Sequence, residues 1–454
     1  MNIVILAAGK GSRMKSSLTK VLHQIGGKSM ISHVVQTAIC LKPKKIFIVV
    51  SENKSDIEAE LAPFFKLNIQ IMFIDQNPAL GTGHAAMLTT PHLDNSYETL
   101  VLYGDVPLVS LNSLKVLCQK PDKPILRVLT ALIDNPKGYG RIIRDDNGLI
   151  KNCVEEKDTN VHERNINEIN TGIMFATTRE LISWLTKIDN NNAQNEYYLT
   201  QIVSLANTDK VAVSPVITSD IEEVIGVNSL AQKSEVERIY QKKCAIEFSK
   251  EGLEITDINR FDLRGELIFG DGVKIDIGCL FIGKVTIGEG VIIEPYCIII
   301  NSTIGSDTVI KAFTHIENSA IGPESTIGPY SRLRLNSVVD KNCKIGNFVE
   351  TKNIKLDKNS KVNHLSYIGD TQVGKNVNIG AGTITCNYDG HEKHQTTIED
   401  DSFIGSNSEL IAPVTVKKGA TIGAGTTLSE DAPEKSLTIS RTKQVSILDW
   451  KKSK

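Results

Sequence analysis

A short apolar segment followed by a glycine-rich, basic turn stands at the start of the chain. Ile3–Ala8 has the composition of a buried strand, the residues Gly-Lys-Gly-Ser-Arg-Met follow it at 9–14, and Lys20 comes shortly after. Glycines let backbone N–H groups approach an anion, and Arg and Lys neutralise its charge, so this turn could bind phosphate. It matches neither the P-loop nor the dinucleotide fingerprint, because Met14 stands where each requires another residue. An ordinary strand-to-helix turn is the alternative.

Further polar segments of the first half could complete such a site. Gln76 precedes a second glycine-containing turn at 80–84, whose backbone could contact a base edge, and Asp105 follows an apolar strand. Three of the candidate residues have an alternative role: Asp105 could stabilise its own turn, Lys20 could be a solvated charge, and Asn228 could cap the next helix. Polar groups suited to a sugar occur at Gly138–Arg141, Glu155, Asn170–Gly172 and Val227–Asn228.

In the second half, His364 and Tyr367 lie close together inside a glycine-rich repeat. Histidine is the natural general base near neutral pH, because its pKa lies there. Most of the nine histidines are expected to be surface or packing residues. His391 and His394 stand in a polar loop without further ligands, so we do not predict a metal site there.

The elements that must position these residues follow two patterns. Up to about residue 230, strand-like segments at 45–50, 69–74 and 99–103 alternate with helix-like segments at 30–40 and 57–64. This alternation predicts a mainly parallel sheet covered by helices, with ligands at the carboxyl ends of the strands. Residues 231–251 are then expected to form one polar connector helix.

The second pattern is a repeat in which an aliphatic residue precedes glycine. Its interval is often six residues, as from Ile321 to Ile327 and along Ile404, Leu410, Val416 and Ile422. One inward aliphatic per six residues, with a small residue at each corner, is typical of a parallel β-helix, whose coils bury their aliphatics against each other. An antiparallel barrel would give intervals of eight to twelve residues instead.

Composition excludes several classes of function. The 454 residues carry a formal net charge of −2, so there is no basic surface that would indicate nucleic-acid binding. The eight cysteines form no Cys-x-x-Cys pair, which indicates reduced packing residues of a cytoplasmic protein. No apolar stretch is long enough for insertion into a membrane.

In their order and spacing, the segments of the first half resemble the sugar-nucleotide pyrophosphorylases, and the repeat half resembles the hexapeptide-repeat acetyltransferases. With the segments 346–350, 364–367 and 378–390, the chain resembles the bacterial bifunctional N-acetylglucosamine-1-phosphate uridyltransferase/glucosamine-1-phosphate acetyltransferases from Asn2 to about Arg441. The resemblance implies an α/β protein with a Rossmann-like nucleotidyltransferase domain, a connector helix and a left-handed parallel β-helix that assembles as a homotrimer. The expected domains are 1–230, 231–251 and 252–454.

The resemblance implies uridyl transfer from UTP to N-acetylglucosamine-1-phosphate in the first half, with release of pyrophosphate. Arg13 and Lys20 would be catalytic and would neutralise the triphosphate. Asp105 and Asn228 would hold Mg²⁺, which takes few protein oxygens. The other residues implied to contact the nucleotide are Leu6, Ala7, Ala8, Gly9, Gln76, Gly81, Thr82, Tyr103 and Gly104, and those implied to contact the sugar are Gly140, Glu155 and Asn170.

In the second half the resemblance implies acetylation of glucosamine-1-phosphate by acetyl-CoA, the preceding step toward UDP-N-acetylglucosamine for peptidoglycan and lipopolysaccharide. His364 would take the proton from the sugar amine. Asn376 and Asn378 could instead stack as hydrogen-bonded ladders in the β-helix. The implied ligands of the sugar phosphate are Arg334, Lys352, Tyr367 and Asn378, and those of coenzyme A are Ala381, Asn387, Tyr388, Ser406, Ala424 and Arg441.

Two other classes of protein remain as alternatives. A single-activity sugar-nucleotide pyrophosphorylase with a regulatory β-helix would not need His364 or the loop that begins at Asn387. A non-catalytic scaffold with both folds would be expected to lack Arg13, Lys20 or Asp105, and all three are present.

Overall fold

The computed structural model describes residues 1–9, 11–52, 54–67, 69–119 and 125–451, and it divides into two compact units, Met1–Tyr240 and Gln241–Lys454. The division falls inside helix α7 (Leu230–Lys250). No described helix is long and apolar enough to cross a membrane.

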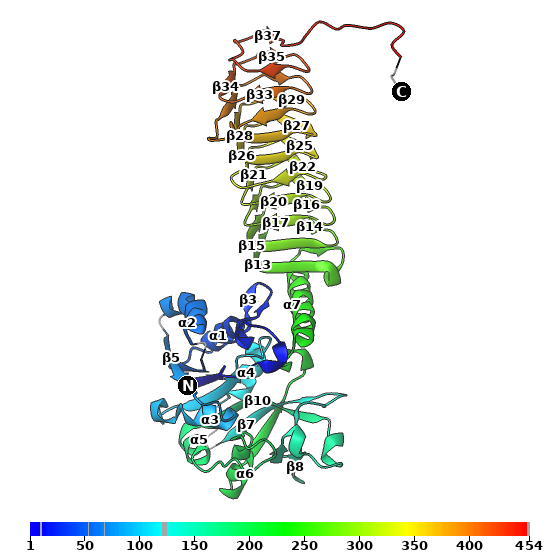
Figure 1. The fold of residues 1–454 in the computed structure, drawn as a ribbon. Helices are drawn as coiled ribbons and strands as arrows, with labels where there is room; N and C mark the ends of the chain where they lie inside the picture. Colours follow the sequence, from blue (N-terminus) through cyan, green and yellow to red (C-terminus); the bar gives the residue numbers. More distant parts are fainter. Residues whose placement is uncertain (10, 53, 68, 120–124, 452–454) are drawn as a thin grey trace. The chain divides into compact units, whose positions relative to one another are not determined.

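The first unit is built on a mixed sheet with the strand order β11-β7-β10-β6-β1-β4-β5 (Figure 1). Strand β1 pairs in parallel with β4 and β6, and β10 is antiparallel to both β6 and β7. The strands are β1 (Asn2–Leu6), β4 (Lys45–Val50), β5 (Gln70–Asp75), β6 (Glu98–Tyr103), β7 (Leu126–Leu132), β8 (Gly140–Arg144), β9 (Ile150–Val154), β10 (Glu168–Thr177) and β11 (Val213–Ile217).

Helices lie against this sheet and close two apolar cores, one on each face. Alternate residues of β1 enter different cores: Val4 and Leu6 belong to one, and Ile3 and Ile5 to the other. All five residues of β1 are buried, which explains why the four that follow Asn2 form an uninterrupted apolar run. The helices are α1 (Met30–Cys40), α2 (Lys54–Leu61), α3 (Thr82–Met87), α4 (Leu111–Leu117), α5 (Thr178–Leu185) and α6 (Gln201–Thr208), and a hairpin is formed by β2 (Gln24–Ile25) and β3 (Lys28–Ser29).

The second unit is a parallel β-helix, seen as a stack of short strands in Figure 1. Its predicted aliphatic repeat forms a buried column, in which Ile327 pairs with Ile345, Ile345 with Val362 and Val362 with Ile379. The strands used below are β23 (Arg332–Leu333), β25 (Lys344–Asn347), β26 (Glu350–Leu356), β27 (Lys361–His364), β28 (Tyr367–Val373), β29 (Asn378–Ile379), β30 (Ile384–Cys386), β32 (Phe403–Ile404), β35 (Thr421–Ile422) and β37 (Leu437–Thr438).

Asparagines stack at one corner of the β-helix. Asn342 donates to Asn359 at 2.9 Å, and Asn359 donates to Asn376 at 3.0 Å, each from Nδ2 to Oδ1. All three have a positive φ, a conformation that Asn tolerates better than most residues. The ladder role considered for Asn376 is therefore confirmed. Asn378 lies on strand β29, outside this corner.

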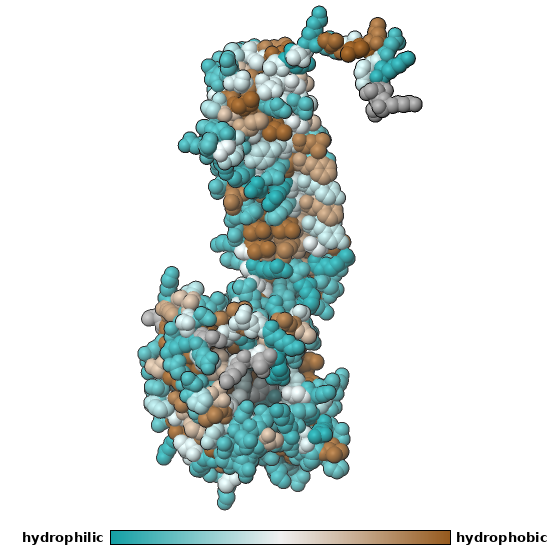
Figure 2. Space-filling model, viewed as in Figure 1, coloured by the Kyte–Doolittle hydropathy of each residue, from teal (hydrophilic) through white to brown (hydrophobic). Residues whose placement is uncertain are grey.

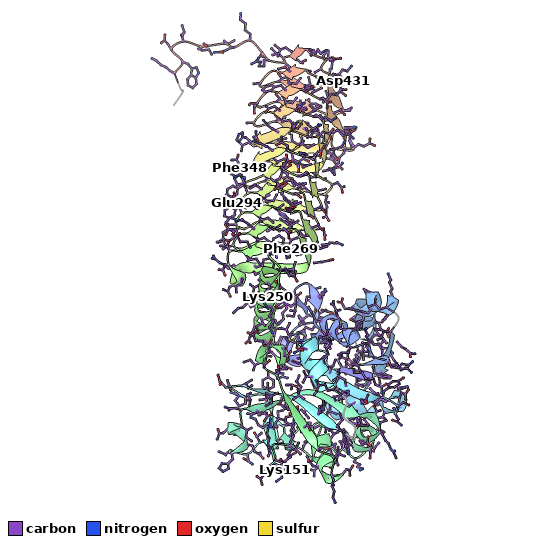
Figure 3. All side chains as sticks on the ribbon, turned by 180° about the vertical axis from the view of Figure 1, so that it is seen from behind. Lys151, Lys250, Phe269, Glu294, Phe348 and Asp431 are labelled. Atoms are coloured by element: carbon purple, nitrogen blue, oxygen red, sulfur yellow. The ribbon has the colours of Figure 1, made fainter. Side chains whose placement is uncertain are left out.

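A second corner carries a column of exposed apolar side chains, which we call the apolar ladder: Tyr296, Phe313, Tyr330, Phe348 and Leu365. The first four rings stack with centroid separations of 5.3, 4.9 and 5.4 Å. Their side chains are 46–56% exposed, and that of Leu365 is 62% exposed. Phe348 lies at one edge of the β-helix in Figure 3, and Figure 2 shows hydrophobic patches on the β-helix surface.

Candidate active sites

A cleft of about 650 Å³ opens in the first unit at the carboxyl ends of β1 and β6. These strands are in register, with Leu6 opposite Tyr103, so the turns that follow them lie beside each other. The predicted residues that line the cleft are Leu6, Ala7, Ala8, Gly9, Lys20, Gln76, Gly81, Thr82, Tyr103, Asp105, Gly140, Glu155, Asn170 and Asn228.

Two cationic side chains and two side-chain oxygens form a network beside the glycine-rich turn that carries Arg13, which we call the phosphate turn because it is predicted to bind phosphate. The Lys20 ammonium binds the carboxylate of Asp105 and donates to Asn228 Oδ1 at 2.7 Å. An Arg13 guanidinium nitrogen donates to the same Asn228 oxygen at 2.9 Å. The Lys20 side chain is only 11% exposed, so it is not a solvated surface charge. The four side chains come from three separate parts of the sequence and therefore meet at one point only in the fold.

The alternative role of Asn228 as a helix cap does not describe this structure. The hydroxyl of Ser229 accepts the N–H of Gln232 at 3.3 Å, which is the contact expected of an N-cap. The side-chain oxygen of Asn228 faces Lys20 and Arg13 instead. The carboxylate of Asp105 likewise faces Lys20, so it is not confined to its own turn.

Gly104, which is predicted to contact the nucleotide, is buried and is not among the residues that line the cleft. Its N–H donates to the carbonyl of Leu6 at 2.9 Å. A Cβ there would lie 3.1–3.3 Å from Ile31, Val21 and Ala7. A side chain at this position would therefore disturb the packing beside the cleft, and the predicted nucleotide contact stays a prediction.

The turn that was predicted to contact the base is held by neighbouring backbone. Gln76, 4% exposed, donates from Nε2 to the carbonyl of Gly81 at 2.9 Å. Gly81 has a φ of +112°, and a Cβ there would press against the backbone of Tyr197. Because the Gln76 amide nitrogen holds the turn, its amide oxygen is the atom that can accept a hydrogen bond from a base.

Carboxylates gather at the end of the cleft where the sugar is predicted to bind. Burial raises the pKa of Glu155, and the neighbouring Asp158 and Glu196 raise it further, whereas a hydrogen bond from Thr200 opposes the shift. Asn170 accepts the N–H of Gly172 at 3.0 Å. Glu196 also lines the cleft, although no motif marked it in the sequence. This end therefore offers acceptors for sugar hydroxyls.

In the β-helix, His364 belongs to a column of residues on consecutive coils. It pairs in register with Asn347, and its Nδ1 lies 3.0 Å from Asn347 Oδ1. An amide oxygen only accepts, so with this assignment Nδ1 carries the proton and Nε2 is the basic nitrogen. Asn347 lies in the segment 346–350, which contributes to the resemblance, but the sequence assigned it no role, because only the coil register brings it to His364.

The same column continues through three residues that were predicted to line the coenzyme A cleft. The carbonyl of His364 accepts the backbone N–H of the residue after Ala381. In the same way, the carbonyl of Ala381 accepts the N–H of the residue after Ser406, and the carbonyl of Ser406 accepts the N–H of the residue after Ala424. Arg441 follows β37, with its guanidinium near Gly423. The predicted base and these small residues therefore lie along one corner.

Several cationic side chains lie near the sheet of the β-helix that contains β26, next to the sheet that carries His364. The backbone N–H of Arg334 donates to the carbonyl of the residue before Lys352 at 2.9 Å. The side chains of Arg334 and Lys352 therefore lie on adjacent coils. Arg334 forms an ion pair with Glu350 at 2.8 Å. The ammonium of Lys393, from the loop after β30, lowers the pKa of Lys352. Close like charges of this kind favour a bound anion.

Not every predicted acetyl-site residue joins these groups. Tyr367 begins β28, and its hydroxyl lies over Gly369 near the Asn387 amide, close to Lys352. Asn378, however, pairs with Lys361 at the far end of β27 from His364. Tyr388 is 60% exposed, and its hydroxyl donates to the carbonyl of Gly390. His394 binds Asp389 at 2.7 Å, which explains it without a metal.

Comparisons with known proteins find matches to separate parts of the chain and to the whole of it. Family models match as a MobA-like NTP transferase domain at 3–131, a GMPPB C-terminal domain at 263–349 and a hexapeptide repeat of succinyl-transferase at 395–430. A solved UDP-glucose pyrophosphorylase complexed with UDP-glucose aligns with 53% of this chain and 98% of its own, at 19% identity and a TM-score of 0.44.

Curated relatives match the whole chain. The Bifunctional protein GlmU of Janthinobacterium sp. (strain Marseille) is 49% identical over 452 residues, which are 100% of this chain and 99% of the relative. That of Herminiimonas arsenicoxydans is 48% identical with the same coverage. The chain belongs to the GlmU family. It is thus a bifunctional enzyme, with a nucleotidyltransferase half and a hexapeptide-repeat acyltransferase half.

Two side-chain oxygens of this GlmU family member are of the kind that Mg²⁺ binds. Asp105 and Asn228 each direct an oxygen to the Lys20 ammonium, so the two oxygens lie on one side of the cleft. Among the described residues there is no group of three or more His, Cys, Asp or Glu that could hold a metal. This donor set suits an ion that keeps phosphate and water ligands, as Mg²⁺ does, and does not form a complete protein cage.

Proposed function

We propose that the chain acetylates glucosamine-1-phosphate with acetyl-CoA and then transfers UMP from UTP to the resulting N-acetylglucosamine-1-phosphate. The observation that carries this proposal is that one chain holds both the network of Arg13, Lys20, Asp105 and Asn228 and the His364–Asn347 pair. The eight cysteines, all free, are compatible with a reducing cytoplasm, where we place the enzyme.

In uridyl transfer, an oxygen of the sugar phosphate attacks the α-phosphorus of UTP, and pyrophosphate leaves. Anions must meet, so the barrier is lowered mainly by positioning and by neutralising charge. Arg13 and Lys20 supply two positive charges at one edge of the cleft. Mg²⁺, held through Asp105 and Asn228, would neutralise further phosphate charge. The carboxylates around Glu155 orient the sugar at the other end of the cleft.

In acetyl transfer, the amine of glucosamine-1-phosphate attacks the thioester carbonyl of acetyl-CoA, the C–S bond breaks, and coenzyme A leaves as a thiolate that takes up a proton. His364 Nε2 accepts the amine proton, while Asn347 holds the ring through Nδ1. Arg334 and Lys352 bind the sugar phosphate, and Lys393 adds a third cation beside them. The small residues Ala381, Ser406 and Ala424, on the coils that follow His364, leave room for the pantetheine arm of coenzyme A along this corner of the β-helix.

Two assays on the purified chain test the proposal, one with UTP and N-acetylglucosamine-1-phosphate and one with acetyl-CoA and glucosamine-1-phosphate. Both products are expected. Product in the first assay alone would favour the single-activity pyrophosphorylase, and product in neither would contradict the proposal.

We further propose that the enzyme is a homotrimer whose acetyl sites are shared between chains. Two observations support this: the apolar ladder exposes five side chains next to the His364 column, and Asn378 lies at the far end of β27 from His364. Exposed apolar columns of this size usually face another protein surface, and closed symmetry is the common outcome for soluble oligomers.

A charge placed in the apolar ladder should separate the chains. Tyr330→Glu is expected to lower the mass measured by light scattering from three chains to one and to abolish most acetyl transfer, with uridyl transfer retained. Phe65→Glu is a matched control in the first unit, since Phe65 is 47% exposed and Tyr330 49%. A monomeric Tyr330→Glu variant with full acetyl transfer would disprove the shared site.

A further inference from the structure

A small apolar core, separate from the two that pack the sheet, lies under the phosphate turn. Its buried members are Met14, Ile25, Met30, Val227 and Val236, each at most 1% exposed. Two of them are the chain neighbours of residues in the cationic network: Met14 follows Arg13, and Val227 precedes Asn228. A shift in this core would therefore move Arg13 and Asn228 relative to each other.

Helix α7 closes this core from one side. Val236 is wholly buried in it, and the ring of Tyr240 packs against it one turn later. A methyl group at Gly26 would overlap the Tyr240 ring, and the Gly26 N–H donates to Glu237 Oε2 at 3.0 Å. The hairpin of β2 and β3, which follows Lys20 in the chain, is thus held against α7 by a ring and a carboxylate.

The first turn of α7 holds Asn228 as well. Gln232 Oε1 accepts the backbone N–H of Asn228 at 2.8 Å. The same residue donates its own N–H to Ser229, as described above. Both the segment that carries Asn228 and the hairpin that follows Lys20 are therefore fixed to one rigid helix.

We propose that Val236, Glu237 and Tyr240 are positioning residues of the nucleotidyl site. By fixing the small core, they set the separation between Asn228 and the turn that carries Arg13 and Lys20. This inference rests on the proposed uridyl transfer. The polar sequence of α7 indicates a connector helix. The inference instead makes the first three turns of this helix part of the catalytic unit. A displacement of about 1 Å at charged groups of this kind can cost up to about 10²-fold in rate.

The test is Val236→Ala in the full-length chain. The variant is expected to lower kcat of uridyl transfer about tenfold, and acetyl transfer, measured on the same preparation, should be unchanged. Val213→Ala is the matched control: Val213 is equally buried, but on the edge strand β11. The control should also lower the melting temperature, because both changes remove the same two methyl groups from a fully buried site, without lowering kcat.

A second variant covers the case in which Val236→Ala does not fold. Tyr240→Ala removes the ring from Gly26 at a half-buried position, and it should give the same loss of kcat. Equal kcat in Val236→Ala and Val213→Ala, well below both melting temperatures, would overturn the inference. If instead the wild-type chain transfers no uridyl group, the proposed function itself fails, and the two failures are thereby distinguished.

Discussion

Replacing His364 with alanine is expected to lower acetyl transfer by about 10²–10⁴-fold, the usual effect of removing a positioned general base. Uridyl transfer should remain at the wild-type rate, because its cleft is lined by residues of the first unit. The measurement is the rate of acetyl transfer at saturating acetyl-CoA and glucosamine-1-phosphate, with circular dichroism to confirm the fold.

Two further variants make this result specific. His391→Ala changes an exposed histidine of the same unit and should leave acetyl transfer intact. Asn347→Ala should cause a smaller loss than His364→Ala, because the base remains but its ring is no longer held at Nδ1. A loss of less than a few-fold in His364→Ala would mean that His364 is not the base.

The architecture could be predicted from the sequence because burial repeats regularly along it. The six-residue repeat places one aliphatic side chain on each face of a coil. Aliphatic residues on the same face of successive coils therefore stack, as Ile327, Ile345, Val362 and Ile379 do. The apolar run of β1 likewise reports that both faces of the strand are covered. Such periodicity can be recognised in a single sequence, because every coil or strand must bury apolar side chains at regular positions.

The site could be predicted only where a local motif marks it. Gly104 belongs to a motif of the cleft, and only the atoms around it show that a side chain there would press against Ile31, Val21 and Ala7. Asn347 meets His364 through coil register, which no local motif reports. The spacing of the sequence left Asn228 open between a cap and a ligand, because Lys20, which it contacts, lies more than 200 residues earlier.

The packing of α7 was hidden for a different reason. The helix is polar overall and carries only a weak apolar stripe, so its composition indicates a solvated connector. Val236 is nevertheless wholly buried, because the surface it meets comes from three distant segments. A single sequence does not show which partner a short apolar stripe will find.

Asp105→Ala is expected to reduce uridyl transfer by at least about 10²-fold, the scale of losing one charge-stabilising group in an active site. The carboxylate is one of the two oxygen ligands proposed for Mg²⁺, and it also holds the Lys20 ammonium in the cleft. Acetyl transfer should stay near wild type. The concentration of Mg²⁺ that gives half-maximal uridyl transfer should also rise, and this separates loss of an ion ligand from a general loss of stability.

The matched control for this variant is Asp75→Ala. Asp75 also ends a strand of the same sheet and also pairs with a lysine, Lys54 at 3.0 Å, but it is not among the residues that line the cleft. Its replacement should leave both activities and the Mg²⁺ requirement unchanged. If Asp105→Ala lost uridyl and acetyl transfer together, with the fold intact by circular dichroism, the two reactions would not have separate sites. An unchanged Mg²⁺ requirement would show that Asp105 acts through Lys20 alone, since the ion would then have lost no ligand.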